Sequence, residues 1–171
     1  MFSFDTIIVS LPRQSFNDAL NCYEQVNKID KEKDPFEYWK YCTWSIMSAS
    51  ISMESYLTHF VRCKSKQTGN EEHLSDIQDF PSRIRFLKEV LGCEIPLYDS
   101  TEFKKIKLAR NVRNDIIHYR KENIFGEITK QNAIDSINAC RELVTFVLTG
   151  YGENPRTKAA WVFETQSRKI T

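Results

Sequence analysis

The 171-residue sequence is poor in residues that interrupt helices, with only five glycines and five prolines. Proteins built from many short strands need such residues at their frequent turns, so this scarcity argues against a turn-rich β-sandwich. No segment approaches the 18 consecutive apolar residues of a membrane span. The opening residues, MFSFDTIIVSLP, lack the basic start and the long apolar run of an export signal. We therefore expect a cytoplasmic protein with no membrane contact.

The cysteines are also few and scattered, and they form no C-x-x-C pair. Metal centres use closely spaced ligands and secreted scaffolds use even numbers of cysteines, so neither is supported. We expect reduced thiols, no metal site and no cofactor. The five residues are Cys22, Cys42, Cys63, Cys93 and Cys140.

The chain has no excess of charge of one sign, because its formal net charge is +1. The sequence as a whole thus gives no electrostatic case for binding nucleic acid, and any such case must come from local clustering. Hydrophobic residues make up 41% of the chain and charged residues 27%, which is typical of a globular domain. A chain of this length indicates one domain.

What the sequence does contain is a series of helix signals separated by short connections. Asp34-Pro35 and Thr129 are strong start signals, Asp99 is a further capping candidate, and Gly92 is a stop signal. The apolar spacing between these signals follows the helical period. We predict an all-α fold, an up-and-down bundle of four to five helices. The expected helices cover residues 16–29, 36–63, 81–91, 100–119 and 129–148.

This pattern divides the chain into three parts. Residues 1–15 are predicted to form an N-terminal extended segment, and residues 16–150 the helical domain. Residues 151–171 form a tail that carries Trp161, Val162 and Phe163. Three adjacent large apolar side chains favour a tail that docks on the bundle or contacts a partner.

The segment ARNVRNDIIHYRK, residues 109–121, contains a charge in an unexpected place. At 100° per residue, Arg113 falls inside the arc of apolar side chains of its helix. The opposite side is a basic stripe, and residues 104–121 hold seven Lys or Arg against one acid. Such clustering fits an anion such as phosphate, although a solvated helix face gives the same pattern. The predicted RNA-binding residues are Lys104, Lys107, Arg110 and Lys121, alongside Asn114 and His118.

The long helix that begins near residue 36 has a matching anomaly. Glu54 lies between Met47 and Val61 in the apolar arc, where a carboxylate needs a partner or a proton. We predict that Glu54 pairs with Arg113 across the bundle and orients its guanidinium. In the alternative, both side chains extend to the surface. The opposite face carries four serines that permit close approach within the chain or to a second copy, namely Ser45, Ser48, Ser52 and Ser55.

The stretch Arg113-Asn114-Asp115-Ile116-Ile117-His118 resembles the R-x(4–6)-H motif of the HEPN superfamily. The motif stands at the end of a late helix in an all-α chain, with one more long helix after it. SASISMESYLTHF, residues 48–60, is similar to the second-helix segment of many HEPN domains. The resemblance covers about residues 16–150.

The resemblance implies a metal-independent endoribonuclease, commonly a toxin or a phage-defence protein. HEPN domains of this kind usually dimerise, and an antitoxin or companion defence protein is a further possible partner. His118 would act as general base or acid, Arg113 would stabilise the charged phosphorane, and Asn114 would position phosphate or histidine. The 2′-hydroxyl of RNA supplies the nucleophile, and histidine exchanges protons near neutral pH.

Two features complicate this reading. Arg113 and His118 lie 140° apart on an ideal helix, so either the helix ends before His118 or two subunits complete the site. Some HEPN toxins carry a tyrosine two residues after the histidine, where this chain has Arg120, with Tyr119 one residue earlier. The alternatives are a non-catalytic helical module that binds RNA or protein, and a bundle whose motif is accidental.

Overall fold

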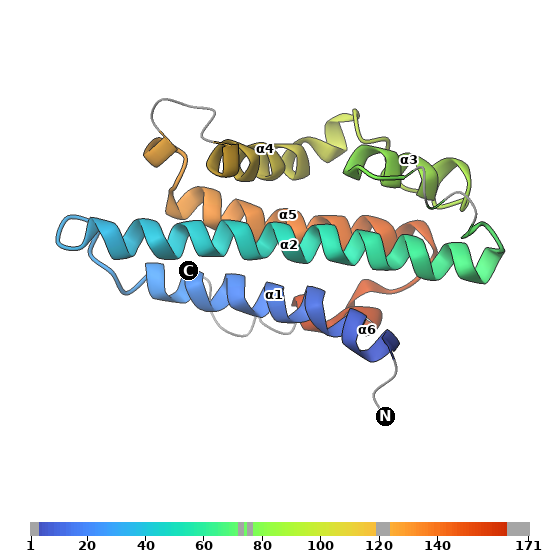
Figure 1. Cartoon of the computed structure of the whole chain (residues 1–171), viewed down its shortest axis with the longest axis horizontal. Coiled ribbons are helices and arrows are strands. Elements are labelled where there is room, and N and C mark those ends of the chain that lie inside the picture. The colour runs from blue at the N-terminus through green and yellow to red at the C-terminus, as the bar shows by residue number, and fades with distance from the viewer. Residues whose placement is uncertain (1–3, 72–73, 75–76, 119–123, 164–171) are drawn as a thin grey trace.

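The computed structural model describes residues 4–71, 74, 77–118 and 124–163. Within these residues the regular structure is helical and there is no β-strand, as predicted. Four long helices, α1, α2, α4 and α5, run alternately up and down (Figure 1). The central helix α2 lies between α1 on one side and α4 and α5 on the other.

Helix α1 spans Phe4–Val26, so the segment expected to be extended is helical from residue 4. Proline is unusual inside a helix, because it lacks an N–H donor. Pro12 nevertheless lies inside α1, and its carbonyl accepts a hydrogen bond from Ser52 Oγ of α2 at 2.7 Å. Ser15, just before the predicted start at residue 16, is buried in the middle of the helix. Packing against α2 therefore outweighs the local preference.

Helix α2 spans Pro35–Thr68 and begins as predicted. The Asp34 carboxylate accepts a hydrogen bond from the Glu37 backbone N–H, and Pro35 occupies the first turn, where its missing N–H costs nothing. The helix ends at Gly69, whose φ of 74° is a left-handed conformation that glycine adopts without strain. Its 34 residues make α2 the support against which the other helices pack.

Two shorter pieces lead into the helix that carries the motif. Helix α3 spans Phe80–Glu89, and a 3-10 turn at Thr101–Phe103 precedes α4 at Lys104–His118. Asp99 does not cap this region, since Ser100 holds the N-cap position and Asp99 lies 3.6 Å from Lys107 Nζ. A second 3-10 turn, Ile124–Gly126, follows α4.

Helix α5, Lys130–Gly150, is capped by Thr129 as predicted. The chain then forms α6, Pro155–Lys158, and α7, Ala160–Phe163. Docking was one of the two alternatives for the tail, and its described part packs on the bundle. The Trp161 ring meets Phe16 of α1 edge to face at 5.6 Å, and Arg141 Nε donates to the Val162 carbonyl at 3.2 Å.

The core is apolar and holds α4 in place. Its largest fully buried side chains include Phe16, Met53, Ile106 and Leu143, one from each long helix. Ile116 packs against both this core and a smaller cluster formed by Val26, Cys42 and Ile128. The C-terminal half of α4 is thereby fixed against α2, which sets the position of the predicted motif.

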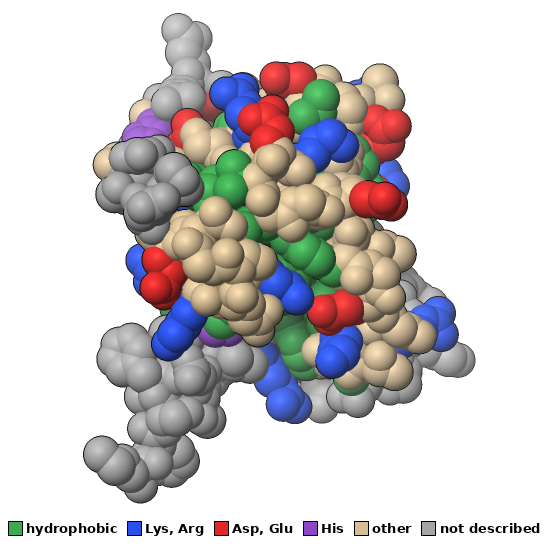
Figure 2. Space-filling view, turned by 90° about the vertical axis from the view of Figure 1, so that its right-hand side faces the viewer, with side chains coloured by type: hydrophobic (Ala, Val, Ile, Leu, Met, Phe, Trp, Pro, Cys, Tyr) green, Lys and Arg blue, Asp and Glu red, His purple; other side chains and the backbone are tan. Residues whose placement is uncertain are grey.

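None of the helices in the described part of the chain has the length and apolar character needed to cross a membrane. One end of the bundle shows basic and acidic side chains interspersed around hydrophobic ones (Figure 2). The described side chains at this end therefore do not gather charge of one sign.

Candidate active site

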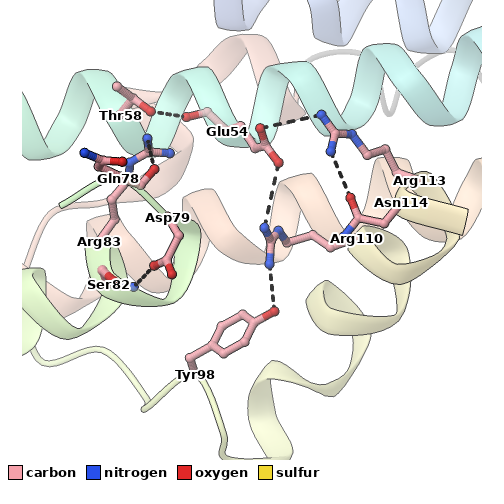
Figure 3. Close-up of polar contacts among 10 residues, drawn as sticks. All are labelled: Glu54, Thr58, Gln78, Asp79, Ser82, Arg83, Tyr98, Arg110, Arg113 and Asn114. Atoms are coloured by element: carbon pink, nitrogen blue, oxygen red, sulfur yellow. Dashed lines mark hydrogen bonds and ion pairs between the residues drawn. The ribbon is translucent and has the colours of Figure 1, made fainter. Parts of the chain in front are cut away.

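Arg113 lies on the face of α4 that packs towards α2, as its position in the apolar arc predicts. Its Nη2 atom is 4.0 Å from one carboxylate oxygen of Glu54, and both side chains are partly exposed, at 25% and 32%. The predicted pairing is therefore present (Figure 3). The separation exceeds hydrogen-bond length, so the pair is a solvated ion pair of modest strength.

Asn114 fixes the Arg113 guanidinium from the other side. Its Oδ1 atom accepts a hydrogen bond from Arg113 Nη1 at 2.8 Å. Arg113 Nε is buried and has no hydrogen-bond partner among the described residues. A guanidinium carries five N–H donors, and among the described residues most of those of Arg113 make no hydrogen bond. The group is oriented without being saturated, which suits a side chain that binds an anion.

Arg110 does not lie on the outward basic stripe where the sequence placed it. Its side chain is only 17% exposed, its Nη2 is 3.9 Å from the second Glu54 oxygen, and its Nη1 donates to Tyr98 Oη at 2.8 Å. The guanidinium also stacks over Phe80 at 4.3 Å. Ideal helical angles missed this because an arginine side chain is long enough to bend towards a carboxylate and two rings.

Sequence reasoning missed Arg83 of α3. Burial lowers the pKa of its guanidinium, and the nearby Glu54 carboxylate opposes that effect. In Figure 3, Glu54 lies between Arg83 and Arg113. We call Arg83, Arg110 and Arg113 the guanidinium cluster. No local signal marks Arg83, because its role depends on the placement of α3 beside α2.

His118 is the last residue of α4 and its side chain is exposed. The helix thus includes His118, so the idea that it ends earlier is wrong. Arg113 and His118 remain on different faces of one continuous helix. Within one chain the two motif residues are presented in different directions, with the arginine towards α2 and the histidine towards solvent.

The lysines of the predicted stripe are less uniform than expected. Lys104 is exposed. Lys107 is 32% exposed, pairs with Asp99 and lies 5.4 Å from the centre of the Tyr98 ring. Lys121 lies outside the described residues, as does the departure at residues 119 and 120. The described part of the stripe is therefore Lys104 with a partly neutralised Lys107.

In the residues that the structure describes, no group of three or more His, Cys, Asp or Glu side chains could hold a metal ion. The cysteines are all free thiols, and three of them are buried. Burial raises the pKa of Cys42 and Cys93 to about 11 and that of Cys140 to about 12. Since the thiolate is the reactive form, these three are unsuited to nucleophilic or ligand chemistry.

In comparisons with known proteins, no family model, no curated protein and no solved structure matches the chain.

Proposed function

We propose that this protein is a metal-independent endoribonuclease of the HEPN type, with a HEPN-like helical bundle. The observation that carries the proposal is the state of Arg113. A guanidinium in an apolar arc is held by Glu54 and Asn114 while keeping unpaired donors, five residues before an exposed histidine on the same helix. An accidental motif would more readily leave Arg113 fully exposed and without a partner.

The residues have distinct roles in the proposed reaction. His118 accepts the proton of an RNA 2′-hydroxyl as that oxygen attacks the adjacent phosphorus, and the 5′-oxygen leaves with a proton from a second acid. Arg113 offers two N–H groups to the phosphorane oxygens, whose negative charge increases in the transition state. Asn114 keeps the guanidinium in that orientation. The products are a 2′,3′-cyclic phosphate and a 5′-hydroxyl.

A homodimer completes this proposal. Because Arg113 and His118 face different directions in one chain, a second copy is needed to bring an arginine and a histidine to the same phosphate. The outer face of α2 offers a contact surface. Trp44 and Ile51 are 59% and 43% exposed there, with the partly exposed Ser48 and Ser55 beside them. Ser45 and Ser52 are not part of it, since they donate to the α1 carbonyls of Ala19 and Pro12.

The proposed setting is a cytoplasmic toxin or phage-defence protein whose substrate is RNA. An antitoxin or companion defence protein would be the partner that restrains it. The competing function is a non-catalytic helical module that binds RNA or protein. The pairing of Glu54 with Arg110 and Arg113 favours that alternative to a degree, because it also serves to hold α2 and α4 together.

Incubation of the purified chain with total RNA, with and without EDTA, separates these functions. The enzyme cuts RNA in EDTA, and both His118→Ala and Arg113→Ala lose about 10²–10⁴-fold of the rate. The matched control Lys105→Ala, an exposed residue of α4 outside the predicted RNA-binding set, keeps cutting. Tight binding without cutting supports the module. Cutting that survives in both variants contradicts the proposed active site.

A further inference from the structure

The guanidinium cluster holds more positive charge than the described carboxylates near it balance. Glu54 presents one oxygen to Arg110 at 3.9 Å and the other to Arg113 at 4.0 Å. Arg83 lies near the same carboxylate. The charge of Asp79 also acts on Arg83 and Arg110, and its Oδ1 accepts a hydrogen bond from the Ser82 backbone N–H at 2.7 Å, which caps α3. Among the described residues, three guanidinium groups therefore face two carboxylates, and the cluster keeps a positive excess.

Arg110 is the structural member of this cluster. Its guanidinium stacks over Phe80 and donates a hydrogen bond to Tyr98. Its side chain is 17% exposed, less than the side chains of Glu54 and Arg113. Arg83 is held less completely by the described residues, since its one hydrogen bond to them joins Nη2 to the Gln78 carbonyl at 2.9 Å. A partly exposed guanidinium with this single contact keeps donors for a ligand.

The repulsion around Arg83 points to an anionic ligand. Burial is the main cause that lowers the pKa of this guanidinium, and the positive charges of Arg62 and Arg110 add to it. Like charges gathered in a partly dehydrated place are costly unless an anion neutralises them. Glu54 and Asp79 supply only part of that neutralisation. Arginine forks match phosphate oxygens in a bidentate way, so a phosphate group is the ligand that this chemistry favours.

We propose that Arg83 is a phosphate-binding residue, which holds a phosphate of the RNA next to the one that reacts at Arg113 and His118. This inference rests on the proposed ribonuclease function and deepens it. Because Arg83 comes from α3 and lies on the far side of Glu54 from Arg113 in Figure 3, the two guanidinium groups take different phosphates of one strand. The substrate is thus an RNA that extends beyond the reacting linkage.

The test measures binding of a fluorescent single-stranded RNA of about ten nucleotides to the His118→Ala chain, which does not cut it. Adding Arg83→Gln weakens binding about tenfold, the usual worth of a charged hydrogen bond. It also reduces the slope of log K against log salt concentration by about 0.7, where K is the association constant, since one phosphate contact is lost. The matched control Arg85→Gln, on the exposed face of the same helix, changes binding less than about twofold.

Two further measurements exclude a folding effect. Arg83→Lys keeps the charge without the fork and gives an intermediate loss, with the melting temperature of each variant recorded. In the active chain, Arg83→Gln slows cleavage of the long RNA but not of a dinucleotide, which has a single phosphate. Equal binding by Arg83→Gln and Arg85→Gln overturns the inference, as does an equal loss on both substrates.

These outcomes separate the inference from the proposed function. If the wild-type chain cuts RNA and Arg83→Gln binds like the control, the function stands and the inference fails. If the wild-type chain does not cut but binding depends on Arg83, the function fails and the phosphate site stands. If the chain neither cuts nor binds RNA, both are wrong.

Discussion

The two long sides of α2 contact their neighbours by different chemistry. Towards α1, the buried hydroxyls of Ser45 and Ser52 donate to backbone carbonyls at 2.8 and 2.7 Å. Towards α4, the partly exposed Glu54 faces two guanidinium groups at 3.9 and 4.0 Å. The first contact is short, neutral and closed to water, and the second is long, charged and open.

The difference indicates which side supports the fold and which is available for a ligand. Buried hydrogen bonds between small side chains and carbonyls allow two helices to approach closely and leave no donor unused. Ion pairs of 4 Å at the surface contribute little to stability, and they leave guanidinium donors for other acceptors. The charged side of α2 is therefore the side on which we propose that a phosphate binds.

The largest expected effect is on activity at the charged side. Arg113→Gln should slow RNA cleavage about a hundredfold, because it removes the fork that stabilises the phosphorane. The free energy of unfolding should change by less than about 1 kcal/mol, since the ion pair is partly exposed. Single-turnover cleavage and urea denaturation measure the two quantities. Lys105→Gln, on the same helix, is the control. Similar cleavage rates for both variants would contradict the assignment of ligand binding to the charged side of α2.

The next effect is on stability at the neutral side. Ser52→Ala should lower the free energy of unfolding by about 1–2 kcal/mol, because the buried hydroxyl loses its hydrogen bonds to the Pro12 carbonyl and from the Cys140 thiol. Ser55→Ala is the control, since its hydroxyl donates within its own helix. Urea denaturation of both variants checks this. An equal, small loss in the two would show that the α1 contact does not depend on the buried hydroxyl.

A smaller effect depends on pH at the start of α3. Hydrogen bonds from Ser82 hold the pKa of Asp79 below its ordinary value, so the charged form is favoured in the folded state. Its contribution is therefore full above about pH 4 and is lost as pH falls through the lowered pKa. Asp79→Ala should cost about 1 kcal/mol at pH 7 and progressively less as the pH falls through the lowered pKa. Unfolding free energies across this range test it, and a pH-independent difference would refute the cap.

A last effect on stability, also small, is at Glu54 itself. Glu54→Gln should lower the free energy of unfolding by about 1 kcal/mol, because its ion pairs are long and partly exposed while the guanidinium groups lose a neutralising charge. Cleavage should still fall several-fold, since Arg113 loses part of the support that orients it. A Glu54→Ala variant tests the same point with the side chain removed. Unchanged stability together with unchanged activity in both variants would dispose of the orienting role.

The sequence was sufficient for those features that depend on local signals. Capping residues and the apolar period located α2, α3 and α5, and the misplaced charges of Glu54 and Arg113 located a contact between two distant helices. The start of α1 was wrong by twelve residues, because the packing of Pro12 on α2 is a tertiary effect. Local rules do not contain that contact.

The site was less predictable than the helices. Arg110 was assigned outwards by its helical angle, yet its flexible side chain turns towards Glu54, Phe80 and Tyr98. Arg83 carried no signal at all, since only the docking of α3 brings it to the cluster. Angles on a helix describe where a Cβ atom points, and a long cationic side chain then follows the nearest carboxylate and ring.

The central claim is that the 2′-hydroxyl of RNA is the nucleophile at a site formed by Arg113 and His118. The most direct measurement compares cleavage, in EDTA, of one RNA oligonucleotide and of the same sequence with 2′-deoxyribose at every position. We predict that the wild-type chain cuts the RNA, leaves 5′-hydroxyl ends and does not cut the deoxyribose strand, and that His118→Ala cuts neither. Equal cutting of both strands, or an intact RNA, would contradict the account.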